Sequence, residues 1–163
     1  MNNEKYTEKL DYIQLESRII TRLNQERYIV VATLSKNTIL NRRVTYVNSN
    51  LNIGIFKWKN SGNPDQYKKG SYAGLCLPGK IDLQIDGKII NFIDGISGNN
   101  HLINLYKYKL PETYLKIEKA NNFCFLEIMP SVIKLLEYIN NKLFLSYLEI
   151  EKEMAYRKLL SIW

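Results

Sequence analysis

The sequence is poor in the residues that build metal centres and disulfides. Its 163 residues include two cysteines and one histidine, and the cysteines form no CxxC pair. A zinc or haem site would therefore lack its usual ligands, and we expect no metal. Cys76 and Cys124 lie in apolar runs, where a free thiol behaves as a small buried hydrophobic residue, so neither is expected in a disulfide.

Long hydrophobic runs are also missing. No stretch of about 18 consecutive apolar residues occurs, and MNNEKYTEKLDY at the N-terminus lacks the apolar segment of a secretory signal. We therefore expect a cytoplasmic protein without a membrane partner.

Charge is present but not concentrated. Hydrophobic residues make up 45% and charged residues 24%, as in soluble globular domains, and the length suits one domain over residues 1–163. The net charge of +7 favours anionic partners such as phosphates and nucleotides. Nucleic acid is not the expected partner because no recognisable motif supports it, although stacking on a surface rich in Tyr and Lys stays a third alternative.

The first third of the chain predicts one helix followed by strands. The helix is indicated by four apolar residues at helical spacing, Leu10, Ile13, Ile20 and Leu23. YIVVATL, residues 28–34, is rich in β-branched residues and predicts a buried strand. Residues 43–48 and 51–57 predict two further strands that pair as a hairpin.

The middle of the chain predicts a turn and more strands. NSGNPDQYKKG predicts a turn and a short helix that ends at Gly70, and strands resume at Tyr72. Residues 81–86 alternate apolar and polar side chains, and Asp86-Gly87 before KIINFI is a strong hairpin signal. We therefore expect two strands joined by a tight turn at Asp86-Gly87.

The last third predicts helices between strands. A helical pattern begins at His101, Pro111 interrupts it, and residues 114–119 add a further turn. FCFLEIM and VIKLLEYI predict two strands divided by Pro130, and the charged segment from Glu149 predicts a C-terminal helix that docks on a partner. Many antiparallel strands with helices at intervals and ends predict an α+β domain, mainly β, built on a β-barrel.

The order of these parts over residues 20–135 resembles the pyridoxamine 5'-phosphate oxidase-like, FMN-binding split-barrel proteins. Four segments carry the resemblance: YIVVATL, NRRVTYV, LNIGIFKWKNSGNPDQYKKGSYAGLCL and KIDLQIDG. The resemblance implies a split β-barrel with flanking helices. It also implies a homodimer with FMN sites at the subunit interface.

The resemblance further implies which residues contact FMN. The segment from Arg43 to Tyr46 corresponds to the strand along the isoalloxazine ring, without the proline that the family often has there. Counting back from Gln66, Lys57, Ser61 and Asn63 take the Thr, Ser and Lys positions of the phosphate site. Trp58 either covers the ring or caps the barrel. The implied FMN-binding residues are Arg43, Val44, Thr45, Tyr46, Lys57, Trp58, Ser61, Asn63 and Gln66.

Asn63 replaces the family's lysine, and Asp65 adds a negative charge beside it. Losing one charge-assisted hydrogen bond weakens binding by about 1.5–3 kcal/mol, so another cation has to compensate. The candidates for this role are Lys57, Lys59, Lys68 and Arg43.

No catalytic residue is evident from the sequence. His101 lacks a visible Ser, Cys or Asp companion and is expected at the surface. The C-terminal arginine and histidine of a true pyridoxamine phosphate oxidase are not evident either, although Arg157 is present, so we do not expect that activity. The expected function is an FMN-dependent oxidoreductase acting on an unknown small molecule. The alternative is a flavin-free split barrel that binds another ligand or serves as a scaffold.

Overall fold

Six antiparallel strands close into a barrel in the computed structural model, which describes residues 7–35, 38–59, 67–79, 82–94, 100–120 and 122–160. Around the barrel, each strand pairs with the next and the last pairs with the first. The order is β2 (Tyr28–Ser35), β3 (Thr38–Ser49), β4 (Asn52–Trp58), β7 (Phe123–Ile139), β6 (Asp82–Asp94) and β5 (Tyr72–Leu77). The predicted mainly β barrel and the predicted pairing of residues 43–48 with 51–57 are confirmed.

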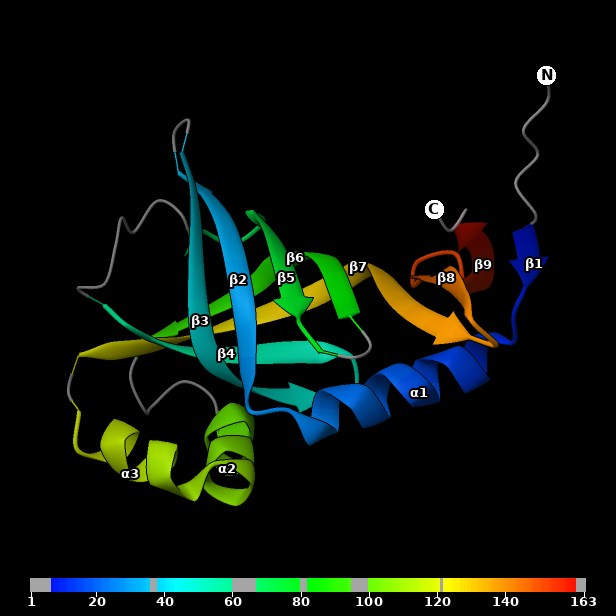
Figure 1. Cartoon of the computed structure of the whole chain (residues 1–163). Coiled ribbons are helices and arrows are strands. Elements are labelled where there is room, and N and C mark those ends of the chain that lie inside the picture. Colours follow the sequence, from blue (N-terminus) through cyan, green and yellow to red (C-terminus); the bar gives the residue numbers. More distant parts are fainter. Residues whose placement is uncertain are drawn as a thin grey trace.

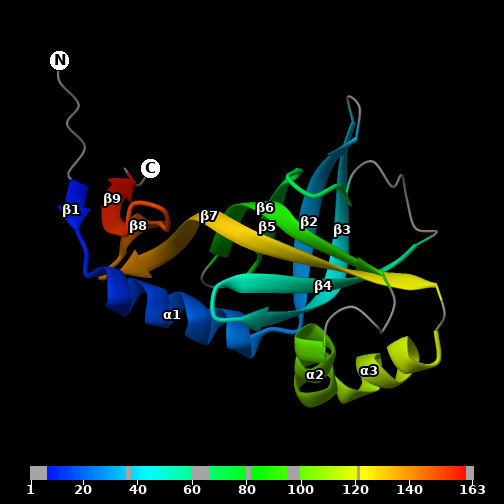
Figure 2. The same ribbon diagram turned by 180° about the vertical axis from the view of Figure 1, so that it is seen from behind.

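The long strand β7 continues beyond the barrel into a sheet extension. Its second half pairs with β8 (Lys142–Glu149), which is followed by β9 (Met154–Leu160) and β1 (Thr7–Lys9) (Figures 1 and 2). The predicted C-terminal helix is therefore wrong. A turn through Glu153, at φ 49°, folds the charged segment back onto β8 as a hairpin, and pairing with β8 from Met154 to Leu160 takes the place of a helix.

The predicted hairpin at Asp86-Gly87 is also wrong, because β6 runs straight through these residues. The register between β6 and β7 shifts there as a β-bulge, and Gly87 lies opposite Pro130. A Cβ at Gly87 would lie 2.7 Å from the Met129 carbonyl oxygen. Proline has no N–H to give to a ladder, so it is tolerated inside β7 beside this bulge, and β7 is one strand where two were predicted.

Helix α1 (Tyr12–Gln25) lies along the junction of the barrel and the extension (Figure 1). The Asp11 side chain accepts the Gln14 N–H at 2.8 Å and so caps its first turn. Its buried residues are Leu15, Ile19 and Leu23, at steps of four. The helix was predicted, but its buried face is rotated from the expected one, and Ile13 is 67% exposed.

Helices α2 (Asn100–Lys109) and α3 (Pro111–Glu118) cover the outside of the barrel. Figure 2 shows them beneath β3, β4 and the start of β7. They bury a second apolar cluster that includes Tyr106, Ile117, Phe123 and Phe125. Both helices and the break at Pro111 match the sequence pattern.

Three smaller expectations concern the cysteines, the length of apolar helices and Gly70. Cys124 is buried, Cys76 is half-buried, and both are free thiols. None of the helices in the described part of the chain is long and apolar enough to cross a membrane. Gly70, the expected helix stop, has φ 89°, but most of the segment expected to form that helix lies outside the described residues.

Candidate functional site

The strands β3 and β4 separate part-way along the barrel, and we call this opening the split. They pair only from Tyr46 opposite Ile55 to Ser49 opposite Asn52. Beyond Tyr46, β3 continues against β2, and beyond Ile55, β4 continues against β7. The split therefore lies between residues 42–45 of β3 and residues 56–58 of β4.

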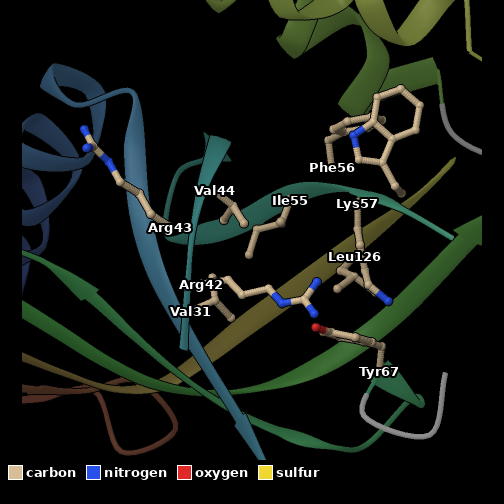
Figure 3. Close-up of a pocket in the computed structure, with 10 residues that line it drawn as sticks. Val31, Arg42, Arg43, Val44, Ile55, Phe56, Lys57, Tyr67 and Leu126 are labelled. Atoms are coloured by element: carbon tan, nitrogen blue, oxygen red, sulfur yellow. The ribbon is translucent and has the colours of Figure 1, made fainter. Parts of the chain in front are cut away.

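A cavity of about 390 Å³ opens at the split, within the range of small-molecule sites. It is lined by Val31, Arg42, Arg43, Val44, Ile55, Phe56, Lys57, Trp58, Tyr67 and Leu126 (Figure 3). Most of these side chains are apolar, and several belong to the barrel core. The cavity is therefore the open end of the barrel interior.

Two cations, Arg42 and Lys57, face each other across this apolar cavity. Figure 3 shows the Arg42 guanidinium and the Tyr67 hydroxyl pointing toward one another, with the Lys57 ammonium nearby. The Lys57 Nζ lies 3.7 Å from the centroid of the Tyr67 ring, and Tyr67 is only 6% exposed. Such a pair suits an anion, because an anion offsets two positive charges held in apolar surroundings.

The electrostatics of Lys57 reflect this setting. Burial lowers the pKa of its ammonium group; the neighbouring Cys124 thiol opposes this shift in the pKa, and Arg42 adds to it. Lys57 stands directly opposite Cys124 on β7, which explains their proximity. The positive charge at the cavity is therefore held at some cost in free energy.

Arg43, the arginine favoured by the resemblance, is turned away from the cavity. It lines the wall, but its Cζ lies 4.4 Å above the centroid of the Tyr28 ring, and Figure 3 shows its side chain directed away from Lys57. Neighbouring residues of a strand point to opposite faces, so Arg42 and Arg43 cannot both enter. The structure brings Arg42 to the cavity.

The nine residues predicted to bind FMN have different places. Arg43, Val44, Lys57 and Trp58 line the cavity. Tyr46 is buried, and its hydroxyl donates to the Leu23 carbonyl at 2.7 Å. Thr45 lines a smaller cavity of about 100 Å³ beside α3. Ser61, Asn63 and Gln66 lie outside the described residues, as does Asp65.

Sequence reasoning missed Arg42 and Tyr67 as cavity residues. The signal for Arg42 was present, because Arg42, Val44 and Tyr46 share one face of β3 by the period of two. For Tyr67 no signal existed, since no periodic pattern of a strand or helix places its side chain at the cavity.

Trp58 stands where β4 leaves the barrel. Its side chain is 45% exposed, and its ring meets Phe56 edge-on with centroids 5.0 Å apart. Phe56 in turn contacts Phe123 and Phe125 in the cluster beneath α2. Trp58 is therefore an aromatic side chain at the rim, joined to the helical layer through Phe56.

Comparison with solved structures places this geometry among known folds. A pyridoxamine 5'-phosphate oxidase-related, FMN-binding protein of Nostoc punctiforme matches with a TM-score of 0.61 at 16% identity, covering 94% of this chain and 98% of that one. The chain has the split-barrel fold of these proteins. A protein related to general stress protein 26, of the pyridoxinephosphate oxidase family, from Clostridium acetobutylicum matches at 0.65 and 12% identity, covering 88% and 99%.

A protein named for another group also matches. HutZ, the heme storage protein from Vibrio cholerae, matches with a TM-score of 0.55 at 10% identity, covering 69% of this chain and 88% of that one. No family model and no curated protein matches the sequence. The comparisons therefore confirm the fold implied by the resemblance, and the ligand has to be argued from the cavity.

Proposed function

We propose that this split barrel binds FMN in the cavity at the split and acts as an FMN-dependent oxidoreductase on a small molecule. The observation that carries the proposal is the pair of cations, Arg42 and Lys57, inside an apolar cavity between two separated strands. A phosphorylated aromatic ligand needs both features at once.

The residues present fit such a ligand. The phosphate pairs with the guanidinium of Arg42 and the ammonium of Lys57. These two cations can replace the family's phosphate-binding lysine, whose position Asn63 occupies in this sequence. The flat ring system fits against the apolar side chains of Val31, Val44 and Leu126. Strand edges at the split offer backbone groups to the polar edge of a flavin.

The protein's part in the chemistry is positional. Bound FMN supplies electron or hydride transfer, and the chain supplies orientation and electrostatics. Arg42 and Lys57 fix the phosphate end, while the apolar wall keeps water from the ring. Trp58, 45% exposed in the cavity lining, is available to contact the substrate.

Haem is the second candidate, because HutZ shares the fold. His101, the chain's single histidine, is exposed in α2 and does not line the cavity. The described lining contains no methionine or cysteine, which leaves Tyr67 as its one side chain among the usual iron ligands. The cation pair suits the carboxylates of haem as well as a phosphate, so it is the scarcity of iron ligands in the described lining that favours FMN.

The proposal includes a homodimer in the cytoplasm. The resemblance places flavin sites between two subunits, and an open cavity such as this one can be completed by a second copy. The free thiols Cys76 and Cys124 support a reducing compartment. Light scattering after size exclusion tests the dimer: a mass of twice the 19.2 kDa chain supports it, and a monomer contradicts it.

The binding experiment is a titration of the purified protein with FMN, and separately with haemin, followed by flavin fluorescence and Soret absorbance. We expect saturable FMN binding at micromolar or lower concentration and weaker, non-saturating changes with haemin. A protein that ignores FMN at high micromolar concentration is a flavin-free split barrel. Tight haemin binding with no FMN binding selects the second candidate.

A further inference from the structure

The point where β3 and β4 part is occupied by a side chain from helix α2. The register that pairs Tyr46 with Ile55 would next pair Thr45 with Phe56. The Tyr106 hydroxyl stands between those two residues: it accepts the Phe56 N–H at 2.9 Å and donates to the Thr45 carbonyl at 3.0 Å. It therefore bridges the donor and acceptor that would otherwise continue the ladder.

Tyr106 is held firmly in this position. It is completely buried, and its hydroxyl also lies 3.3 Å from the Gly54 carbonyl oxygen. Burial raises the pKa of its hydroxyl, so it stays neutral and keeps the proton it donates. Its ring packs on Phe125 with centroids 5.5 Å apart.

Helix α2 is packed directly on β4 at the same point. A Cβ added to Gly54 would lie 2.5 Å from the Leu102 Cδ2, so only glycine allows this close approach without movement of Leu102. A second anchor is Lys109, whose Nζ donates to the Asn24 Oδ1 at 2.7 Å and to the Asn48 Oδ1 at 3.1 Å. The helix is fixed at both ends of its contact with the barrel.

A line of aromatic contacts connects the Tyr106 side chain to the rim of the cavity. Tyr106 contacts Phe125, Phe125 contacts Phe56, and Phe56 meets Trp58. Both walls of the split carry cavity residues close to the bridge: Arg42 is three positions from Thr45 on β3, and Lys57 is next to Phe56 on β4. The bridge therefore joins the two strand segments that carry the two cations.

We propose that Tyr106 is the positioning residue of the cavity: its hydroxyl ends the pairing of β3 and β4 and so sets the distance between Arg42 and Lys57. Ligand binding at the split is then coupled to the seating of α2. The coupling to ligand rests on the proposed function, whereas the effect on the strands does not.

A purely structural role is the competing explanation, because any buried tyrosine needs a hydrogen-bond partner. If the role is purely structural, removing the hydroxyl lowers the stability of the protein but leaves the ligand affinity and the surroundings of Trp58 unchanged. Both explanations remove the acceptor of the Phe56 amide, so they differ at the cavity: only the positioning role also changes the surroundings of Trp58 at the rim and the affinity for ligand.

The test compares Tyr106→Phe with Tyr108→Phe in a Trp163→Phe background that leaves Trp58 as the only tryptophan. Tyr108 is on the same helix and 86% exposed, so its variant removes the same atom without touching the split. In the ligand-free proteins we expect faster hydrogen exchange at the Phe56 amide and a shifted Trp58 emission for Tyr106→Phe alone. The ring stays in place, which prevents direct pairing of Thr45 with Phe56.

The ligand arm uses FMN. We expect Tyr106→Phe to weaken FMN binding about tenfold and Tyr108→Phe to leave it within twofold. A lowered melting temperature with unchanged Trp58 emission and affinity overturns the proposal. If the parent does not bind FMN, the proposed function fails. Phe56 exchange and Trp58 emission in the ligand-free proteins still test whether the Tyr106 hydroxyl positions the two strands.

A second variant covers the case in which Tyr106→Phe does not fold. Leu102→Ala keeps the hydroxyl but loosens the packing of α2 on Gly54. We expect the same changes at Phe56 and Trp58, smaller in size. Unchanged exchange at Phe56 in a Leu102→Ala protein whose α2 amides exchange faster overturns the coupling.

Discussion

Arg42 and Arg43 are neighbours on β3 whose guanidinium groups lie on opposite sides of the strand. Figure 3 shows Arg42 pointing toward Tyr67 in the cavity, with Lys57 nearby, and Arg43 directed away from them. The Arg43 Cζ lies 4.4 Å from the centroid of the Tyr28 ring. The two residues have the same charge and differ by one position. They therefore form a natural matched pair for testing where the ligand binds.

Arg42→Ala should weaken FMN binding, because it removes a charge-assisted contact to the phosphate. The expected loss is about 1.5–3 kcal/mol, or roughly ten- to a hundredfold in the dissociation constant. Arg43→Ala is the control and should change the constant less than threefold. Equal effects of the two variants, measured by fluorescence titration, would contradict the assignment of Arg42.

The affinity for FMN should fall at alkaline pH because of Lys57. Burial lowers the pKa of its ammonium, so it loses its charge, and its attraction for phosphate, at a lower pH than an ordinary lysine. A bound phosphate favours the ammonium and raises its pKa again, so the ligand-free protein sets where the fall begins. Titrations across the alkaline range should show this fall for the parent.

Lys57→Arg provides the control, since a guanidinium keeps its charge throughout this range. The affinity of Lys57→Arg for FMN should not fall across the alkaline range. A change caused by FMN itself would appear equally in the parent and in the variant. An identical pH profile for the parent and Lys57→Arg would remove Lys57 from the site.

Much of the barrel could be predicted from the sequence. The strand YIVVATL, the hairpin of β3 and β4, and the helices on both sides of Pro111 follow from local patterns that the tertiary structure did not override. The fold class followed from the order of these parts. At the site, Arg43, Val44, Lys57 and Trp58 were named before the structure and do line the cavity.

The errors arose where a local sequence pattern is compatible with two different structures. Asp86-Gly87 suits a tight turn, but the same glycine suits a bulge opposite Pro130, and only the partner strand decides between them. The segment after Glu149 fits both a helix and a strand, and pairing with β8 decided it. Arg43 was named and does line the cavity, but Arg42, which shares its face of β3 with Val44, was missed. Tyr106 is brought to the split by tertiary packing alone.

Gly87→Ala should destabilise the protein. Its Cβ would meet the Met129 carbonyl oxygen at 2.7 Å and the Ile128 Cγ2 at 3.1 Å, so backbone has to move. We expect a loss of about 1–3 kcal/mol in the free energy of unfolding, measured by urea denaturation. Gly74→Ala is the control, because its Cβ would meet only the Ala32 Cβ at 3.8 Å. A Gly87→Ala protein as stable as Gly74→Ala would contradict the close packing at the bulge.

Arg18→Ala should weaken the attachment of α1 to the extension. Arg18 donates to Glu137, a carboxylate 5% exposed, which the variant leaves without its charged partner. The Arg18 side chain is 50% exposed, so solvent screening reduces the expected loss to about 1–2 kcal/mol. Glu8→Ala, which breaks an exposed pair with Arg157, should cost less than about 1 kcal/mol. Equal unfolding midpoints for the two variants would show that the pair of Arg18 with Glu137 adds no more stability than the exposed pair of Glu8 with Arg157.

The central claim is that Arg42 and Lys57 bind the phosphate of a flavin at the split. The most direct measurement is the ratio of the dissociation constants for riboflavin and FMN, which differ only in that phosphate. We predict that the parent binds FMN at least about tenfold more tightly than riboflavin and that the ratio falls to near one in the double variant Arg42→Ala, Lys57→Met. Equal binding of the two flavins by the parent, or a ratio that the double variant does not change, would contradict the claim.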